Sequence, residues 1–163
     1  MPSPSMIIVG MADLNVTKAP GALTTLGLGS CVGIALYDAR VKVAGLAHIM
    51  LPDSKSIQNN SNTAKFADTA LVKLVSDMVK LGAKRESMKA KIAGGAQMFA
   101  FNSTNDSMRI GDRNVEATLR LLKQVGIPLV AQETGANYGR TVVLYADDGR
   151  FEIKTIGHGN RVL

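Results

Sequence analysis

Cysteine is nearly absent from this chain: Cys31 is the only one among 163 residues. A single cysteine excludes an intramolecular disulfide framework and fits a reducing compartment. One cysteine and two histidines also fall short of the four Cys or His ligands of a usual structural zinc site. The sequence therefore predicts neither a disulfide nor a structural metal site.

Long apolar runs are missing as well. No run approaches the roughly 20 residues that cross a bilayer. Residues 1–5 lack the basic region and apolar stretch of a secretory signal. We therefore expect a cytoplasmic protein without membrane insertion.

Aromatic side chains, which stack on the bases of nucleic acids, make up only 4% of the chain, and tryptophan is absent. The net charge is +6, but the basic residues are scattered rather than clustered. An acidic protein partner fits this charge at least as well as a nucleic acid. We expect no binding to nucleic acid.

The remaining composition, 46% apolar and 20% charged, is typical of a soluble globular protein. The length predicts one domain over residues 1–163 with a sizeable core. The order of apolar patterns predicts a mixed α/β chain without internal repeats. Strands are expected at residues 6–13, 23–28, 31–37, 41–51, 88–93, 129–133, 141–145 and 151–155.

Two segments have the apolar spacing of helices. Residues 63–81 carry an apolar stripe, with Asn62 or Thr63 as N-cap and Gly82 at the end. Residues 112–125 carry a second stripe, which a glycine and a proline terminate. We expect these two helices to cover the strands.

The strands at 31–37 and 41–51 are expected to form a hairpin. If residues 39–40 form its turn, residue 38 lies opposite residue 41. The two residue numbers of every opposed pair then sum to 79. Cys31 and His48 also sum to 79, which predicts Cβ atoms roughly 5 Å apart on one face. Both faces are largely apolar, so the hairpin is expected at the centre of a sheet and covered on both sides.

A thiol beside an imidazole is the minimal pair of nucleophile and base. Without this partner, a lone cysteine is more often an inert buried side chain. Glycines at positions 27 and 29 can give the backbone positive φ and let a substrate approach closely. A third group should orient the imidazole, and Thr25, Asp38 and Asp53 are candidates. His158, between two glycines, is expected on a surface loop.

Two further segments lie near these residues. Residues 52–62 are polar and start four residues after His48, so they form either a lid or substrate contact, or a solvated connection. Residues 94–99 are glycine-rich but lack the spacing and lysine of a phosphate loop. A tight turn beside the site is expected there, with Met98 and Phe99 in the core. No motif requires a cofactor.

Several blocks together resemble the CheD family of chemoreceptor glutamine deamidases. The first two are Thr25-Leu26-Gly27-Leu28-Gly29-Ser30-Cys31-Val32 and Ala47-His48-Ile49-Met50-Leu51-Pro52. The others are residues 65–70, 91–96, 98–99, 110–111, 113–115, 135–137 and Arg140. The chain departs from the family pattern at Phe66, where tyrosine is common, and at Ala136, where glycine is expected. The blocks are in order and span nearly the whole chain.

The resemblance implies a layered sandwich of mixed β-sheets flanked by two main helices, an α/β chain of the α+β type. It implies a cytoplasmic chemotaxis enzyme that converts glutamine side chains of chemoreceptors to glutamate, with no cofactor. The family's catalytic cysteine falls on Cys31, its histidine on His48, and the threonine that supports the histidine on Thr25. The implied partners are the cytoplasmic helices of methyl-accepting chemoreceptors and a CheC-type phosphatase.

In the expected mechanism, Cys31 attacks the glutamine amide and His48 moves the protons. Gly29 and Ser30 are expected to contact the substrate, and backbone N–H groups from Gly29 to Cys31 to stabilise the oxyanion. The alternative is a non-catalytic module that binds receptors or CheC and modulates signalling. A general cysteine peptidase is a third hypothesis, which predicts backbone cleavage.

Overall fold

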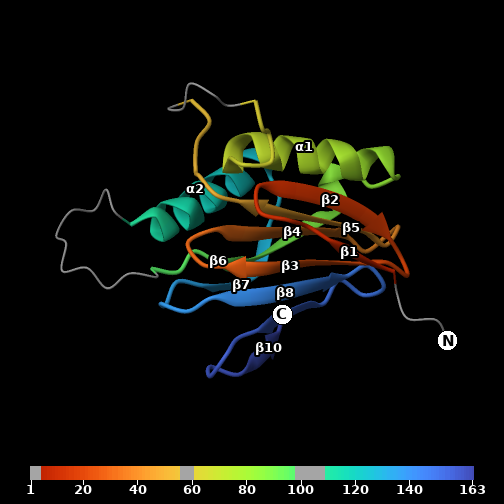
Figure 1. Ribbon diagram of the computed structural model, residues 1–163. Coiled ribbons are helices and arrows are strands. Elements are labelled where there is room, and N and C mark those ends of the chain that lie inside the picture. Colours follow the sequence, from red (N-terminus) through yellow and green to blue (C-terminus); the bar gives the residue numbers. More distant parts are fainter. Residues whose placement is uncertain (1–4, 56–60, 98–108) are drawn as a thin grey trace.

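The computed structural model describes residues 5–55, 61–97 and 109–163. Its elements form three layers (Figure 1): two helices, a five-stranded central sheet, and a five-stranded outer sheet. The expected layered α/β sandwich of mixed sheets flanked by two helices is confirmed. Met98 and Phe99, predicted in the core, lie outside the described residues, as do residues 56–60 of the polar segment.

The central sheet has the order β2-β5-β4-β6-β7. Its strands are β2 (Asp13–Lys18), β4 (Val32–Asp38), β5 (Val43–Ile49), β6 (Met88–Gly94) and β7 (Leu129–Thr134). All neighbours are antiparallel except β6 and β7, which run parallel. The predicted hairpin, β4 and β5, lies at the centre of this sheet as expected.

The outer sheet has the order β1-β3-β8-β9-β10. Its strands are β1 (Met6–Ile8), β3 (Ala22–Leu28), β8 (Arg140–Tyr145), β9 (Phe151–Lys154) and β10 (Asn160–Val162). β10 was not predicted, because its three residues are all exposed and show no alternation.

Two apolar clusters cover the two faces of the hairpin. Val32, Ile34 and Leu36 pack with the helices, whereas Ala35 and Leu46 pack between the two sheets with residues of β3, β8 and β9. Because successive residues of a strand point to opposite faces, the two sets lie on opposite sides of the sheet, and the expectation that both faces of the hairpin are covered is confirmed. Cys31 belongs to the cluster between the sheets.

The helices are α1 (Ala67–Lys80) and α2 (Ile110–Val125), with a short 3-10 turn, η1, at Arg85–Ser87. The N-cap predicted at Asn62 or Thr63 is wrong. Phe66 is extended and bridges to Leu51, so α1 begins only after it. The predicted C-terminal glycine of α1 is confirmed, since Gly82 follows the helix with a positive φ of 104°.

The predicted single strand at 6–13 is also wrong. It is split into β1 and the start of β2, with Ala12 at a positive φ of 56° before β2. The chain thereby leaves the outer sheet and enters the central sheet, a change of sheet that an apolar pattern does not encode.

The predicted hairpin register is wrong by two residues. Asp38 pairs with Val43, not with residue 41, so residues 39–42 form the connection and paired numbers sum to 81. Lys42 adopts a positive φ of 55° in this longer turn. His48 therefore pairs with Gly33 rather than with Cys31.

No described helix is long and apolar enough to span a bilayer.

Candidate active site

The loop before β4 presents Cys31 between the two sheets. Each of the three backbone carbonyls from Gly29 to Cys31 accepts a hydrogen bond. Ala96 N donates to Gly29 O (2.9 Å) and Gly95 N donates to Cys31 O (2.8 Å). The carbonyl between them, Ser30 O, accepts a hydrogen bond from the side chain of Asn114 (2.9 Å). The described part of the segment predicted as a turn, residues 94–97, thus lies beside the cysteine and holds its loop, whereas residues 98–99 lie outside the described residues.

His48 lies on β5, 1% exposed, and contacts β3 of the other sheet. Its Nδ1 and Thr25 Oγ1 are 2.7 Å apart and share a hydrogen bond whose direction depends on the imidazole tautomer. Thr25 is fully buried. Of the three candidates for orienting the imidazole, Thr25 is the one in contact with it.

The structure places Asp38 and Asp53 in other roles. Asp38 accepts hydrogen bonds from the backbone N–H groups of Arg40 (3.0 Å) and Lys84 (2.9 Å) at the far end of the hairpin. Asp53 accepts from Lys55 N (2.7 Å) in a local turn.

Cys31 and His48 are not a directly opposed pair. His48 pairs with Gly33, and Cys31 lies two residues before Gly33, just ahead of the first residue of β4. A shift of two residues keeps both side chains on the same face. His48 Nε2 is buried and has no hydrogen-bond partner among the described residues, the Cys31 thiol included.

Burial keeps both groups neutral. It raises the pKa of the Cys31 thiol, an effect that the cysteine's own backbone N–H partly offsets. It lowers the pKa of the His48 imidazole. Both shifts disfavour a resting pair of thiolate and imidazolium. The arrangement thus provides an uncharged thiol and an uncharged base.

Irregular backbone in β3 accompanies the site. The pairing of β3 with β8 shifts register between Thr25 and Leu28, and Gly27 there has a positive φ of 70°. Such irregularities redirect side chains next to active sites. Of the two glycines predicted to take positive φ, only Gly27 does so.

Close packing of β3 on the hairpin also depends on a glycine. A Cβ at Gly33 would lie 3.0 Å from Leu28 Cδ1. The missing side chain leaves room for the Leu28 side chain of β3 against β4.

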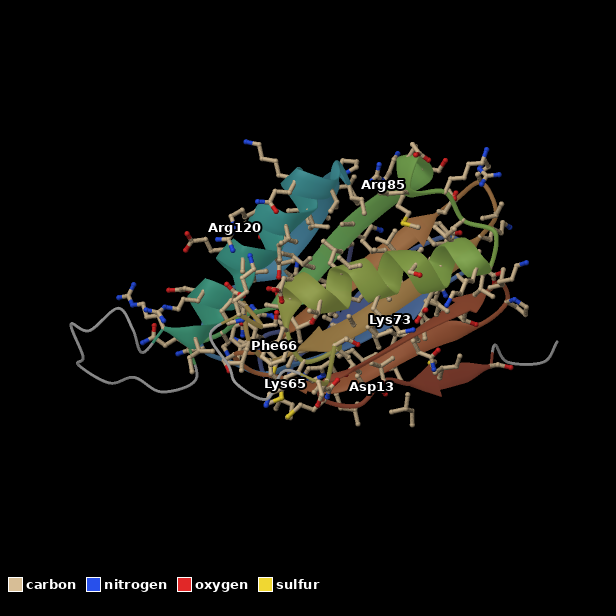
Figure 2. The ribbon with its side chains drawn as sticks, turned by 90° about the horizontal axis from the view of Figure 1, so that it is seen from above. Asp13, Lys65, Phe66, Lys73, Arg85 and Arg120 are labelled. Carbon is tan, nitrogen blue, oxygen red and sulfur yellow. The ribbon has the colours of Figure 1, made fainter. Side chains whose placement is uncertain are left out.

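The site lies at the end of the molecule where both helices begin. Lys65 O accepts hydrogen bonds from the N–H groups of Met50 (2.8 Å) and Leu51 (3.1 Å), just after His48. Asp13 pairs with His48 from the other side. Figure 2 shows Lys65 and Phe66 next to the start of α1.

Part of the polar segment after His48 is anchored to α1. Ser54 N and Oγ both donate to the Asp68 carboxylate, the hydroxyl at 2.8 Å. The segment is therefore tied to the helix layer at Ser54.

His158 is exposed, as predicted, and stacks on Tyr138 with 4.0 Å between ring centroids. Among the described residues, no three of His, Cys, Asp and Glu are grouped so that they could hold a metal ion.

Two buried polar residues beside the site were missed. Asn114 is fully buried on α2, and Arg140 is 2% exposed on β8. The Arg140 guanidinium pairs with Glu133 and donates to Gly94 O (3.4 Å). The spacing of residues 114, 118 and 122, one helical turn apart, was the signal that Asn114 points inward.

Comparison with known proteins gives the family. Residues 50–155 match the CheD family, described as CheD chemotactic sensory transduction. A "Probable chemoreceptor glutamine deamidase CheD" of Caldanaerobacter subterraneus subsp. tengcongensis is 60% identical over 151 residues, 93% of each chain. The "Chemoreceptor glutamine deamidase CheD" of Halalkalibacterium halodurans is 52% identical over 157 residues, 96% of this chain and 97% of the relative.

Among solved structures, the hypothetical protein YfiH of Bacillus licheniformis is 16% identical with a TM-score of 0.46, over 77% of this chain and 51% of that one. The family assignment depends on the sequence matches, which extend over nearly the full length at high identity. By these matches, the chain belongs to the CheD family.

Proposed function

We propose that this protein is a cysteine-dependent protein-glutamine deamidase that acts on chemoreceptors. The observation that carries the proposal is the buried hydrogen bond between Thr25 and His48, on the same inter-sheet face as Cys31, the only thiol of the chain. The printed names of the relatives support the substrate. A buried histidine held by a threonine beside a lone cysteine is the arrangement that thiol catalysis needs.

In the proposed mechanism, His48 Nδ1–H donates to Thr25 Oγ1, which leaves Nε2 unprotonated. Nε2 takes the thiol proton as Cys31 Sγ attacks the carbonyl carbon of the glutamine side chain. His48 then gives this proton to the amide nitrogen, the C–N bond breaks, and ammonia leaves behind a thioester.

Hydrolysis completes the cycle. His48 Nε2 removes a proton from water, the resulting hydroxide attacks the thioester, and the C–S bond breaks. The thiol regains its proton from His48, and the products are glutamate and ammonia. Because burial raises the pKa of the thiol and lowers that of the imidazole, the proposed cycle starts from the neutral thiol and the neutral imidazole.

The oxyanion is proposed to bind backbone N–H groups of the cysteine loop. The carbonyls of Gly29, Ser30 and Cys31 are all occupied by other partners, so this loop would contact a substrate through its amide hydrogens. The Cys31 N–H acts on its own sulfur and is the leading donor.

The test is deamidation of a receptor fragment from the same genome, followed by mass spectrometry of its peptides. Wild-type protein should convert specific glutamines to glutamate, and Cys31→Ala should abolish the conversion while binding and folding persist. Equal conversion by Cys31→Ala, or none by the wild type, would contradict the proposal. Binding without conversion would favour the non-catalytic modulator, and backbone cleavage would identify a peptidase. A CheC-type partner and a cytoplasmic location stay predictions.

A further inference from the structure

Asn114 joins the two strand ends that carry the site. Its Nδ2 donates to Ser30 O (2.9 Å) and to Met50 O (3.0 Å). Ser30 precedes Cys31, and Met50 follows His48 by two residues. One side-chain amide therefore holds both the loop of the thiol and the strand of the imidazole.

This contact closes the open end of the hairpin. The last paired residues of β4 and β5 are Val32 and Ile49. With paired numbers summing to 81, Met50 would be the residue opposite Cys31, but no ladder pair joins these two positions. The two Asn114 hydrogen bonds occupy the place where the next rung of the ladder would be.

Helix α2 reaches this place because glycines permit close contact. A Cβ at Gly111 would lie 2.5 Å from Ala96 O, and a Cβ at Gly95 would lie 2.2 Å from Val115 Cγ2. Real Cβ atoms do not approach so closely. The first turns of α2 thus lie directly on the turn that holds Cys31, and Asn114 points into the site's backbone.

Stability alone gives little reason for an amide at this position. Asn114 is fully buried, and its Oδ1 has no partner among the described residues. A buried polar atom without a partner costs about as much as, or more than, a hydrogen bond contributes in net terms. The unpaired Oδ1 offsets part of what the two bonds of Nδ2 contribute, so their net contribution to stability is smaller than that of two free-standing hydrogen bonds.

We propose that Asn114 is a positioning residue that sets the distance between Cys31 and His48 by clamping Ser30 and Met50. The catalytic part of this proposal rests on the proposed function. Loss of the clamp frees the cysteine loop from the end of β5, so that the thiol moves relative to the imidazole. Misplacement by about 1 Å can lower a catalysed rate about 100-fold.

The test uses Asn114→Ala and Asn114→Leu, the second of which keeps the volume and adds no charge. Thr118→Val is the matched control. Thr118 is equally buried one turn along α2, but within the part of the chain that the structure describes its Oγ1 bonds only to the Asn114 carbonyl (2.8 Å). The first readout is the rate of iodoacetamide alkylation against pH, which reports Cys31 alone because the chain has no other thiol.

We expect both Asn114 variants to shift the alkylation profile to lower pH, because the released thiol gains contact with water and loses the effect of burial. Their kcat on the receptor fragment should fall about 10–100-fold with KM nearly unchanged. The control should keep the wild-type profile and kcat. A general loss of packing would also expose the thiol, so the comparison with Thr118→Val, which loses a buried hydrogen bond on the same helix, separates the clamp from packing.

An unchanged alkylation profile and kcat in both variants would overturn the proposal, as would the same shift in Thr118→Val. Failure of both Asn114 variants to fold would make the residue structural and also overturn it. The alkylation assay needs no receptor. If wild-type protein deamidates nothing, the proposed function fails while the clamp is still tested.

Discussion

At the scale of single residues, two adjacent threonines of β3 have different tasks. Thr24 Oγ1 donates to Val142 O (2.8 Å) within the outer sheet, whereas Thr25 Oγ1 bonds to His48 Nδ1 (2.7 Å) across the two sheets. Alternation along the strand sends one hydroxyl to each side. The pair therefore separates the effect of losing a hydroxyl from the effect of losing the one that holds the imidazole.

Thr25→Val is expected to lower kcat by about 10–100-fold, by analogy with the loss of a hydrogen-bond partner that orients a metal-binding histidine. Without the hydroxyl, Nδ1 has no partner to fix the tautomer that leaves Nε2 free. Thr24→Val is the control and should retain nearly full kcat. Deamidation rates of the two variants, measured side by side, check this. Equal losses would show that His48 does not depend on Thr25.

At the scale of elements, the end of β6 packs tightly against the cysteine loop. Gly94 ends β6 with a positive φ of 107°, and a Cβ there would lie 2.3 Å from Cys31 O. Gly82, after α1, has nearly the same φ of 104°, but a Cβ there would have nothing within 4 Å. The same substitution at both positions thus isolates the contact with the cysteine loop.

Gly82→Ala should lower the free energy of unfolding by about 1–2 kcal/mol, the cost of a side chain in the left-handed region, and leave kcat unchanged. Gly94→Ala should cost more, because the Cys31 carbonyl must also move, and kcat should fall. Urea unfolding and deamidation rates check both parts. Equal stability and full activity in the two variants would contradict the role given to Gly94.

The hairpin shows which part of an element its sequence predicts. The apolar character of both faces of β4 and β5 predicted that the hairpin is covered on both sides, but the pairing was wrong by two residues because the turn spans 39–42 instead of 39–40. A register shift of two residues leaves each side chain on the same face of the sheet but changes the residue opposite it. Cys31 and His48 were thus placed on the correct face for a reason that survives the wrong register.

At the scale of the whole molecule, the site is enclosed by all three layers. Thr25 comes from the outer sheet, His48 from the central sheet, and Asn114 from the helix layer. Enclosure removes water from the titratable groups, which raises the pKa of Cys31 and lowers that of His48. Global stability therefore depends on pH through the site itself.

The pH dependence of folding stability has opposite signs for His48 and Cys31. For His48, the unfolded chain binds a proton more readily, so its contribution to stability is present above about pH 6.5 and is lost as the pH falls through the lower folded pKa. For Cys31, the unfolded chain releases its proton first, so stability declines as the pH rises above about 8.5.

Urea midpoints measured against pH should show both declines. The difference between wild type and His48→Gln should change with pH only on the acid side, and the difference between wild type and Cys31→Ala only on the alkaline side. Differences that stay constant over the whole range would contradict the burial of these groups.

The sequence by itself determined the identity of Cys31, His48 and Thr25 as candidates, the two helices, most strands and both faces of the central hairpin. Local chemistry encodes these features: the periodicity of apolar residues, glycines at turns, and the scarcity of cysteine and histidine. The family resemblance, which matches over nearly the full length bear out, could also be recognised from the residues alone.

Only the tertiary structure decided the register of the hairpin, the division of residues 6–18 between two sheets, and the delayed start of α1. It also placed Thr25, rather than Asp38 or Asp53, in contact with His48. The Asn114 amide contacts Ser30 and Met50 only through the tertiary fold. These features arise between segments far apart in the chain. Their geometry follows from how closely layers can pack, at glycines such as Gly33 and Gly111, and no single stretch of sequence contains it.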